Sequence, residues 1–247
     1  MKENSKKILL FLYPSENESV WWNLDELHDL LPHLSLAGLQ SALFLLDKKD
    51  LLRIDKTQVK WRYSLSSHGR SYLEELFPAL CESNEQWRGE WSLIIFLEAP
   101  KSDKNFRYLR SYLTQNKAIA LTRAVYLYPG SLSEKIHADL QNSYKNAVLV
   151  MKVSKWLFGD DFKVIGQKAQ LNDLFELYSS ISKELDRLIS IRSNEKSFTQ
   201  QEKTAFFSVL SRFLGVLEID AALLRLYFPQ VESARKLLFK FQNGLRI

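Results

Sequence analysis

The sequence of 247 residues predicts an α+β protein built from three consecutive parts. In the first part helical patterns are followed by two short alternating strands, and in the second apolar strand-like runs alternate with amphipathic helices. In the third part apolar residues recur at helical spacing almost without interruption. We expect these parts to be residues 1–82, 87–167 and 168–247. A hydrophobic content of 46% supplies enough apolar side chains for sizeable cores.

The first part opens with helical segments around a short extended one. SKKILLFLY (5–13) predicts a helix, and VWWNL (20–24) predicts an extended segment. LDELHDLL (24–31) predicts a second helix, for which either Asn23 or Asp25 is a suitable N-cap.

A third helix and a hairpin follow. SLAGLQSALFLLDKK (35–49) predicts a helix with Ser35 as its N-cap. Its core-facing stripe is expected to comprise Leu36, Leu39, Leu43 and Leu46. LLRI (51–54) and VKWRYSL (59–65) alternate as strands do, and a further helix is expected from about Ser67. This order of elements is that of a winged helix-turn-helix, in which the third helix enters the major groove of DNA.

Basic residues concentrate around this hairpin. Between Lys48 and Arg70 the chain has seven basic and two acidic residues, an excess equal to its whole net charge of +5. Such a local excess is typical of a surface that binds a polyanion. The candidate DNA-binding residues are Ser35, Gln40, Ser41, Lys48, Lys49, Arg53, Lys56, Gln58, Lys60, Arg62 and Arg70. Cations of the hairpin would contact phosphates, and Gln40 with Ser41 would face bases.

Two other interpretations of this part remain open. The hairpin is a solvated basic surface without a partner, or the winged helix is a protein-interaction module that binds little specific DNA. The third helix contains no arginine, which is the residue that most often reads guanine.

The second part predicts the element order βαββαβ, which is the ferredoxin-like pattern. Its segments are, in chain order, SLIIFLE (92–98), KNFRYLRSYLTQNKA (104–118), AIALTRAVYLYPG (118–130) as two strands, SLSEKIHADLQNS (131–143) and AVLVMKVS (147–154). Ser131 precedes Glu134 by three residues, the spacing of a capping box.

Several segments together resemble a known family. They are VWWNL, SALFLLDKKDLLRI, WRYSLSSHGRSYLEE, WRGEWSLIIF, AVYLYPG, FFSVLSRFL and LLRLYFPQVESARKLLFKF, and their order along the chain resembles the PaaX-like family of bacterial transcriptional regulators. The resemblance implies a homodimeric transcriptional repressor that binds double-stranded DNA. It further implies that an aryl- or acyl-CoA thioester releases the repressor from its operator. It also implies that the middle domain is similar to the Cas2-like fold of CRISPR adaptation proteins.

The chain departs from the family at the third helix. The family carries arginines there in a segment like VRTALSRL, whereas residues 39–46 are LQSALFLL. Gln40 and Leu45 stand where arginine is expected. We therefore expect phosphate binding by the hairpin to be better retained than base reading.

The third part is predicted to be all-α after a last short strand, FKVI (162–165). Its first helix has an apolar stripe comprising Leu171, Leu174, Leu177, Tyr178, Ile181, Leu185 and Leu188. Such a stripe indicates core packing, and a small part of it is a candidate dimer surface. An effector pocket in this region would need cations for CoA phosphates, and the lysines nearby are Lys152, Lys155, Lys163 and Lys168.

The sequence predicts neither an enzyme nor a bound cofactor or metal. The four histidines show no metal-ligand spacing, and no phosphate-binding glycine loop or nucleophile motif occurs. The Cas2-like resemblance leaves one alternative, a metal-dependent nuclease that uses Glu98 with Asp103 nearby. The simpler expectation is that Glu98 caps a strand or pairs with a lysine.

The cellular compartment is predicted from cysteine use and hydropathy. Cys81 is the single cysteine, so no internal disulfide can form. No apolar run has the length needed to span a bilayer. We therefore expect a cytoplasmic protein without a membrane partner.

Overall fold

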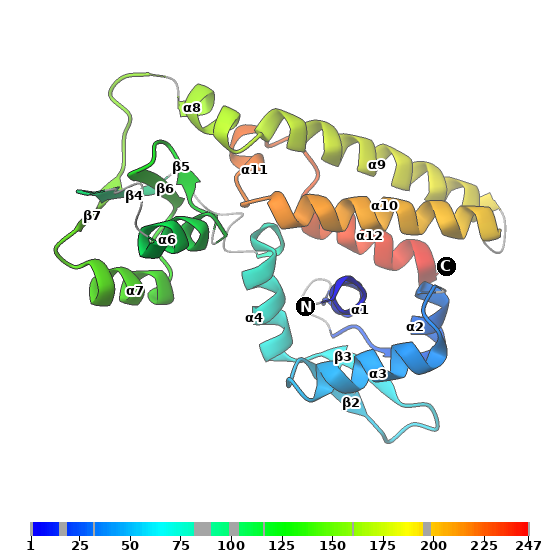
Figure 1. Ribbon diagram of the computed structural model, residues 1–247. Helices are drawn as coiled ribbons and strands as arrows, with labels where there is room; N and C mark the ends of the chain where they lie inside the picture. The colour runs from blue at the N-terminus through cyan, green and yellow to red at the C-terminus, as the bar shows by residue number, and fades with distance from the viewer. Residues whose placement is uncertain are drawn as a thin grey trace. The chain divides into compact units, whose positions relative to one another are not determined.

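The computed structural model describes residues 2–14, 19–31, 33–81, 90–98, 104–115, 117–159, 161–194 and 199–246. Its helices accompany two antiparallel β-sheets, which confirms the predicted α+β class (Figure 1). The chain divides into two compact units. The first comprises Met1–Cys81, Leu177–Asp220 and Glu232–Ile247, and the second comprises Glu82–Glu176 and Ala221–Val231.

These units group the residues differently from the three consecutive parts expected from the sequence. Two long segments near the C-terminus belong to the same unit as the N-terminal 81 residues. Gln242 shows why, because its side chain bonds to the backbone of the N-terminal helix. An apolar helix face packs on whichever element offers complementary surface, and sequence order does not reveal that element.

The N-terminal elements of the first unit follow the predicted order. They are α1 (Glu3–Phe11), β1 (Trp22–Asn23), α2 (Leu24–Leu30), α3 (Leu36–Asp47), β2 (Leu52–Asp55), β3 (Arg62–Leu65), α4 (Ser67–Leu76) and the 3₁₀ turn η1 (Pro78–Leu80).

Side-chain caps fix where these helices begin. Asn23, and not Asp25, caps α2, because its side chain accepts a hydrogen bond from the backbone of Glu26 at 3.0 Å. Glu26 completes the capping box by accepting from the Asn23 N–H at 2.7 Å. Ser35 caps α3 as predicted, and Ser66 caps α4, which begins at the expected Ser67.

The small sheet has the strand order β1-β3-β2, so β3 is central. Leu39, Leu43 and Leu46 of α3 are buried, as predicted. The prediction for Leu36 is wrong, since this side chain is 44% exposed. Leu36 is the first residue of α3, so no preceding turn of this helix covers its side chain.

The first unit continues with α9 (Leu171–Asn194) from Leu177 onward, α10 (Gln200–Ile219) and α12 (Ala234–Arg246). The predicted stripe on α9 is largely buried, but Leu177 is 36% exposed and lies off it. Tyr178 and Asp220 form a buried hydrogen bond of 2.8 Å. Burial and the Asp220 charge raise the pKa of the Tyr178 hydroxyl well above its ordinary value.

The side-chain amide of Gln242 closes the end of α1. Gln242 is 3% exposed, and its Nε2 lies 3.1, 3.1 and 2.7 Å from the carbonyl oxygens of Leu10, Phe11 and Tyr13. Carbonyl groups at a helix end have no partner within the helix. A residue of α12 therefore bonds the Tyr13 carbonyl and adds a donor to the carbonyls of Leu10 and Phe11, which also accept from the Tyr13 N–H and from Trp22 Nε1.

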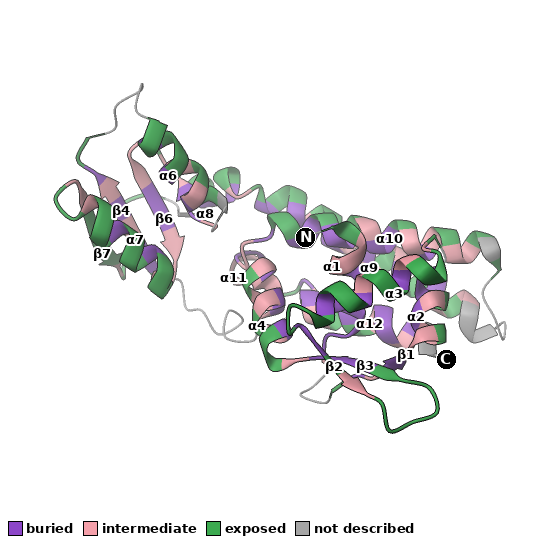
Figure 2. Cartoon of the chain, turned by 60° about the horizontal axis from the view of Figure 1, so that its bottom comes forward, coloured by how far each residue is buried: buried purple, intermediate pink, exposed green. Residues whose placement is uncertain are grey.

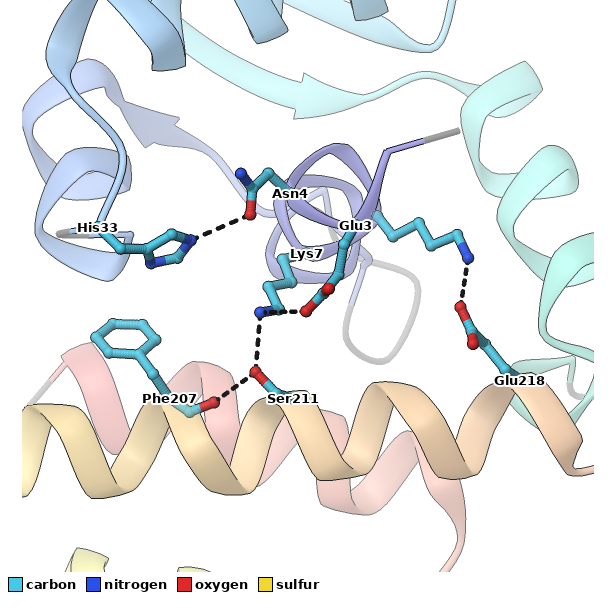
Figure 3. Close-up of polar contacts among 8 residues, drawn as sticks. Glu3, Asn4, Lys7, His33, Phe207, Ser211 and Glu218 are labelled. Atoms are coloured by element: carbon cyan, nitrogen blue, oxygen red, sulfur yellow. Dashed lines mark hydrogen bonds and ion pairs between the residues drawn. The ribbon is translucent and has the colours of Figure 1, made fainter.

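A polar seam, comprising Glu3, Asn4, Lys7, His33 and Ser211, joins α1 to α10 and to the segment before α3 (Figure 3). The buried ammonium of Lys7 donates to the Ser211 hydroxyl at 2.8 Å and pairs with Glu3 at 2.7 Å. His33 Nε2 lies 3.1 Å from Asn4 Oδ1. Burial, followed by the charge of Lys7, lowers the pKa of the His33 imidazole.

The second unit contains the larger sheet, and its βαββαβ element order is the one predicted. The elements are β4 (Trp91–Phe96), α6 (Lys104–Gln115), β5 (Ile119–Ala120), β6 (Val125–Pro129), α7 (Glu134–Tyr144) and β7 (Val148–Val153). The sheet order is β5-β6-β4-β7. Its core includes Ile94 and Phe96 of β4, Leu113 of α6 and Ile136 of α7.

Two local predictions in the second unit are wrong. Residues 162–165 form part of a helix, α8 (Asp161–Lys168), and not a strand. Ile165 and the adjacent Gly166 are both buried, which departs from the alternation of a strand, and a four-residue run is too short to distinguish the two periods. Ser133, and not Ser131, caps α7 by accepting from the backbone of Ile136.

The remaining helix of the second unit is α11 (Leu224–Tyr227). Phe162 of α8 packs its ring against Tyr227 and Phe228, with centroids 5.4 and 5.7 Å apart. None of the helices within the described ranges has the length and hydropathy required to cross a bilayer.

Candidate nucleic-acid interface

A cleft of about 640 Å³ lies in the first unit, where α3, the β2–β3 hairpin and the first turn of α2 meet. Its lining residues are Leu24, Asp25, Gln40, Leu43, Phe44, Asp47, Ile54, Lys56, Lys60, Trp61 and Tyr63. The β-sheet register explains part of this set, because Ile54 and Tyr63 are directly opposite on β2 and β3. Leu43 and Tyr63 are buried, whereas Phe44 and Trp61 are 58% and 50% exposed. The cleft therefore combines a buried apolar base with an aromatic rim.

The hairpin beyond β2 and β3 is exposed along its whole tip (Figure 2). Asp55 holds the start of the tip by accepting from the backbone and hydroxyl of Thr57 at 2.9 and 2.6 Å. The hydroxyl bond, then the backbone bond, lowers the pKa of the Asp55 carboxyl. This short-range turn orders the residues that precede Val59, whose side chain is fully exposed.

One hairpin cation is already paired within the chain. The Lys60 ammonium donates to the Asp25 carboxylate at 2.5 Å, and both side chains are about two-thirds exposed. The hydrogen bond to Asp25 and the charge of Asp25 raise the pKa of Lys60. Such an exposed pair adds little stability, but it cancels the charge that Lys60 offers to a polyanion.

Three other cations lie over aromatic rings. Lys56 Nζ is 4.7 Å from the ring centroid of Trp61, and Lys48 Nζ is 4.9 Å from that of Phe44. The Arg53 guanidinium lies 5.6 Å from the ring of Trp21. Cations so placed are attracted by the ring face, yet they keep their charge toward solvent.

The structure brings most predicted DNA-binding residues together. Within the described part of the chain, five of their cations form no ion pair and are exposed, namely Lys48, Lys49, Arg53, Lys56 and Arg62. Gln40 is exposed on α3 and lines the cleft, and Gln58 is exposed at the hairpin tip. These residues lie on α3, β2, β3 and the connecting turns.

Three predicted residues are engaged elsewhere. The Ser35 hydroxyl caps α3, and the Ser41 hydroxyl donates to the Ala37 carbonyl at 2.8 Å. Arg70 lies on α4, where it pairs with Glu74 at 2.8 Å, and its side chain is 30% exposed. Its positive charge is therefore compensated within the fold.

Sequence reasoning missed four residues of the cleft as functional candidates: Asp25, Phe44, Asp47 and Trp61. Trp61 carried a readable signal, since it stands between Lys60 and Arg62 at the base of a basic hairpin. The two aspartates carried none, because only the fold brings α2 and the end of α3 to the hairpin. Asp47 also helps to raise the pKa of the Tyr63 hydroxyl, after burial.

The residues considered for a nuclease site and for a CoA site are not brought together in a described site. Glu98 is exposed just after β4, and Asp103 lies outside the described residues. In the described ranges no group of three or more His, Cys, Asp or Glu side chains could hold a metal ion. The four lysines considered for CoA phosphates, Lys152, Lys155, Lys163 and Lys168, are exposed in the second unit.

Comparison with known proteins leaves the family open. No family model matches the chain, and no curated protein matches it. Among solved structures, it is similar to an uncharacterized protein, Rv0674, from Mycobacterium tuberculosis. That similarity has a TM-score of 0.49 and 18% sequence identity, and it covers 98% of this chain and 97% of the other.

Proposed function

We propose that this protein is a DNA-binding transcriptional regulator in which α3 and the β2–β3 hairpin form a winged helix. The observation that carries the proposal is the group of five exposed cations without an ion pair that lie just after the end of α3 and on the hairpin. Lysine and arginine contacts to phosphates supply most of the sequence-independent affinity for DNA. In this arrangement α3 enters the major groove, and the hairpin contacts flanking phosphates.

Other parts of the proposal rest on the resemblance to PaaX-like regulators. The second unit has the ferredoxin-like fold of Cas2. Two copies of the protein form a homodimer that represses transcription in the cytoplasm. A homodimer reads two half-sites roughly 34–36 Å apart. An aryl- or acyl-CoA thioester acts as the releasing effector.

Fluorescence anisotropy over a salt series tests the DNA-binding role. The protein is titrated with duplex from upstream of its own gene and with an unrelated duplex of equal length. We expect tighter binding to the upstream duplex, and a preference that persists as salt rises. Equal, steeply salt-dependent binding to both duplexes would reduce the role to phosphate contact, and no binding to either would end it.

Paired variants identify the surface that binds. Lys56→Ala with Arg62→Ala should weaken binding to both duplexes and reduce the salt slope by about 2. Lys163→Ala with Lys168→Ala removes the same charge from exposed sites in the second unit and should leave the slope unchanged. Equal effects of the two pairs would assign the slope to net charge alone.

A second candidate function is protein binding by α3. Leu36, Phe44 and Leu45 are 44%, 58% and 58% exposed, an unusual apolar content for a helix that enters a DNA groove. Leu45→Arg distinguishes the two roles. It should strengthen binding if α3 lies against DNA phosphates, and should leave DNA binding unchanged if that face contacts a protein.

A further inference from the structure

We propose that the cleft between α3 and the hairpin binds one unpaired nucleotide, with its base against the aromatic rim and its phosphate at Lys56 and Lys60. This inference rests on the proposed DNA-binding role and adds to it a specific structural feature of the nucleic acid. The cleft volume of about 640 Å³ is in the range of small-molecule sites.

The rim supplies surfaces on which a base can stack. Trp61 and Phe44 both line the cleft, and about half of each side chain is exposed. Each ring has a lysine beside it, Lys56 at 4.7 Å and Lys48 at 4.9 Å. Exposed aromatic rings next to cations are the arrangement by which proteins bind single-stranded nucleic acid, because every base has a π face and a neighbouring phosphate.

The charged lining of the cleft is balanced and can be redistributed around a nucleotide. It holds two carboxylates, Asp25 and Asp47, and two ammonium groups, Lys56 and Lys60. Lys60 is paired with Asp25, while Asp47 has no ion pair in the described part of the chain. If Lys60 turns to a phosphate, the Asp25 carboxylate is freed to accept a hydrogen bond from the exocyclic amine of a base.

Polar groups of the cleft match the edge of a base that is unpaired. The Gln40 side chain offers both an amide donor and a carbonyl acceptor, and the aspartates offer acceptors. In a duplex the Watson–Crick edge is occupied by the opposite base, so these groups can read it only in an unpaired nucleotide. The absence of arginine from α3 agrees with this mode, since α3 lacks the residue that most often reads a paired guanine.

Four probes at one salt concentration test the inference. They are deoxyadenosine monophosphate, a single-stranded oligonucleotide, a fully paired duplex and the same duplex with one unpaired adenosine. We expect the duplex with the unpaired nucleotide to bind about tenfold more tightly than the paired duplex. Binding of deoxyadenosine monophosphate without the oligonucleotide would overturn the inference in favour of a free nucleotide, and binding of the oligonucleotide would support an unpaired nucleotide of a DNA strand.

Two substitutions at one position separate stacking from folding. Trp61→Ala should abolish the tenfold preference while leaving affinity for the paired duplex within about twofold, and Trp61→Phe, which keeps a ring, should retain most of the preference. Equal affinity of the wild-type protein for the paired and unpaired duplexes, with no binding of the monophosphate, would overturn the inference but leave the DNA-binding role intact. Failure to bind either duplex would instead overturn the DNA-binding role and the inference with it.

Discussion

Asp25→Asn should increase the electrostatic component of DNA binding. In the structure Asp25 neutralises Lys60, so the variant frees one cation at the hairpin. The substitution keeps the size of the side chain and does not remove the α2 cap, which Asn23 provides. Five unpaired cations give a salt slope of at most about −4.5, and a sixth gives about −5.4, from a slope of about −0.9 for each phosphate.

This difference in slope is measurable. Between about 50 and 200 mM salt the variant should lose about 3.5-fold more affinity than the wild-type protein, and it should bind more tightly at the lower salt. Anisotropy with an unrelated duplex is the suitable assay, because the effect is independent of sequence. Glu184→Gln is the control, since it removes a carboxylate from another exposed ion pair, with Arg212 on α10. An unchanged slope for Asp25→Asn, or equal steepening by the control, would refute the reasoning.

Three further predictions concern stability and are measured by urea denaturation. Gln242→Leu removes the amide donor from the Tyr13 carbonyl and one of two donors from the carbonyls of Leu10 and Phe11, and should lower the free energy of unfolding by about 1–3 kcal/mol; an unchanged midpoint would mean that water replaces the amide. Gly69→Ala places a Cβ 2.2 Å from the Leu51 carbonyl oxygen and should destabilise by about 1–3 kcal/mol or more, whereas Gly215→Ala meets nothing within 4 Å and should stabilise by up to about 1 kcal/mol. Because burial lowers the pKa of His33 in the fold, the folded state binds fewer protons; stability is full above the ordinary pKa of 6.5 and should fall as the pH drops through and below it, a loss that His33→Gln should reduce.

Local sequence signals predicted the elements well because they act over a few residues. Ser35 caps α3, α4 begins at Ser67, and the βαββαβ order is observed. Errors occurred where two local choices were nearly equal. Ser131 and Ser133 were both suitable caps, and residues 162–165 were too few to distinguish a strand from a helix.

Cations are concentrated around the hairpin in the sequence, and their exposure could be predicted from the polar character of that segment. Which of these cations are neutralised by an ion pair could not be predicted. Asp25 is 35 residues from Lys60 in the chain, yet their side chains meet at 2.5 Å. Arg70 belongs to the same basic stretch but pairs with Glu74 on α4.

The sequence by itself thus determined the α+β class, the βαββαβ order, the Ser35 cap of α3 and the basic hairpin, because each depends on neighbours along the chain. Only the tertiary structure decided that α12 closes the end of α1, and that α2, α3 and the hairpin enclose a cleft. Those arrangements depend on contacts between residues far apart in sequence. Apolar periodicity shows which face of a helix is buried, but it does not name the partner that buries it.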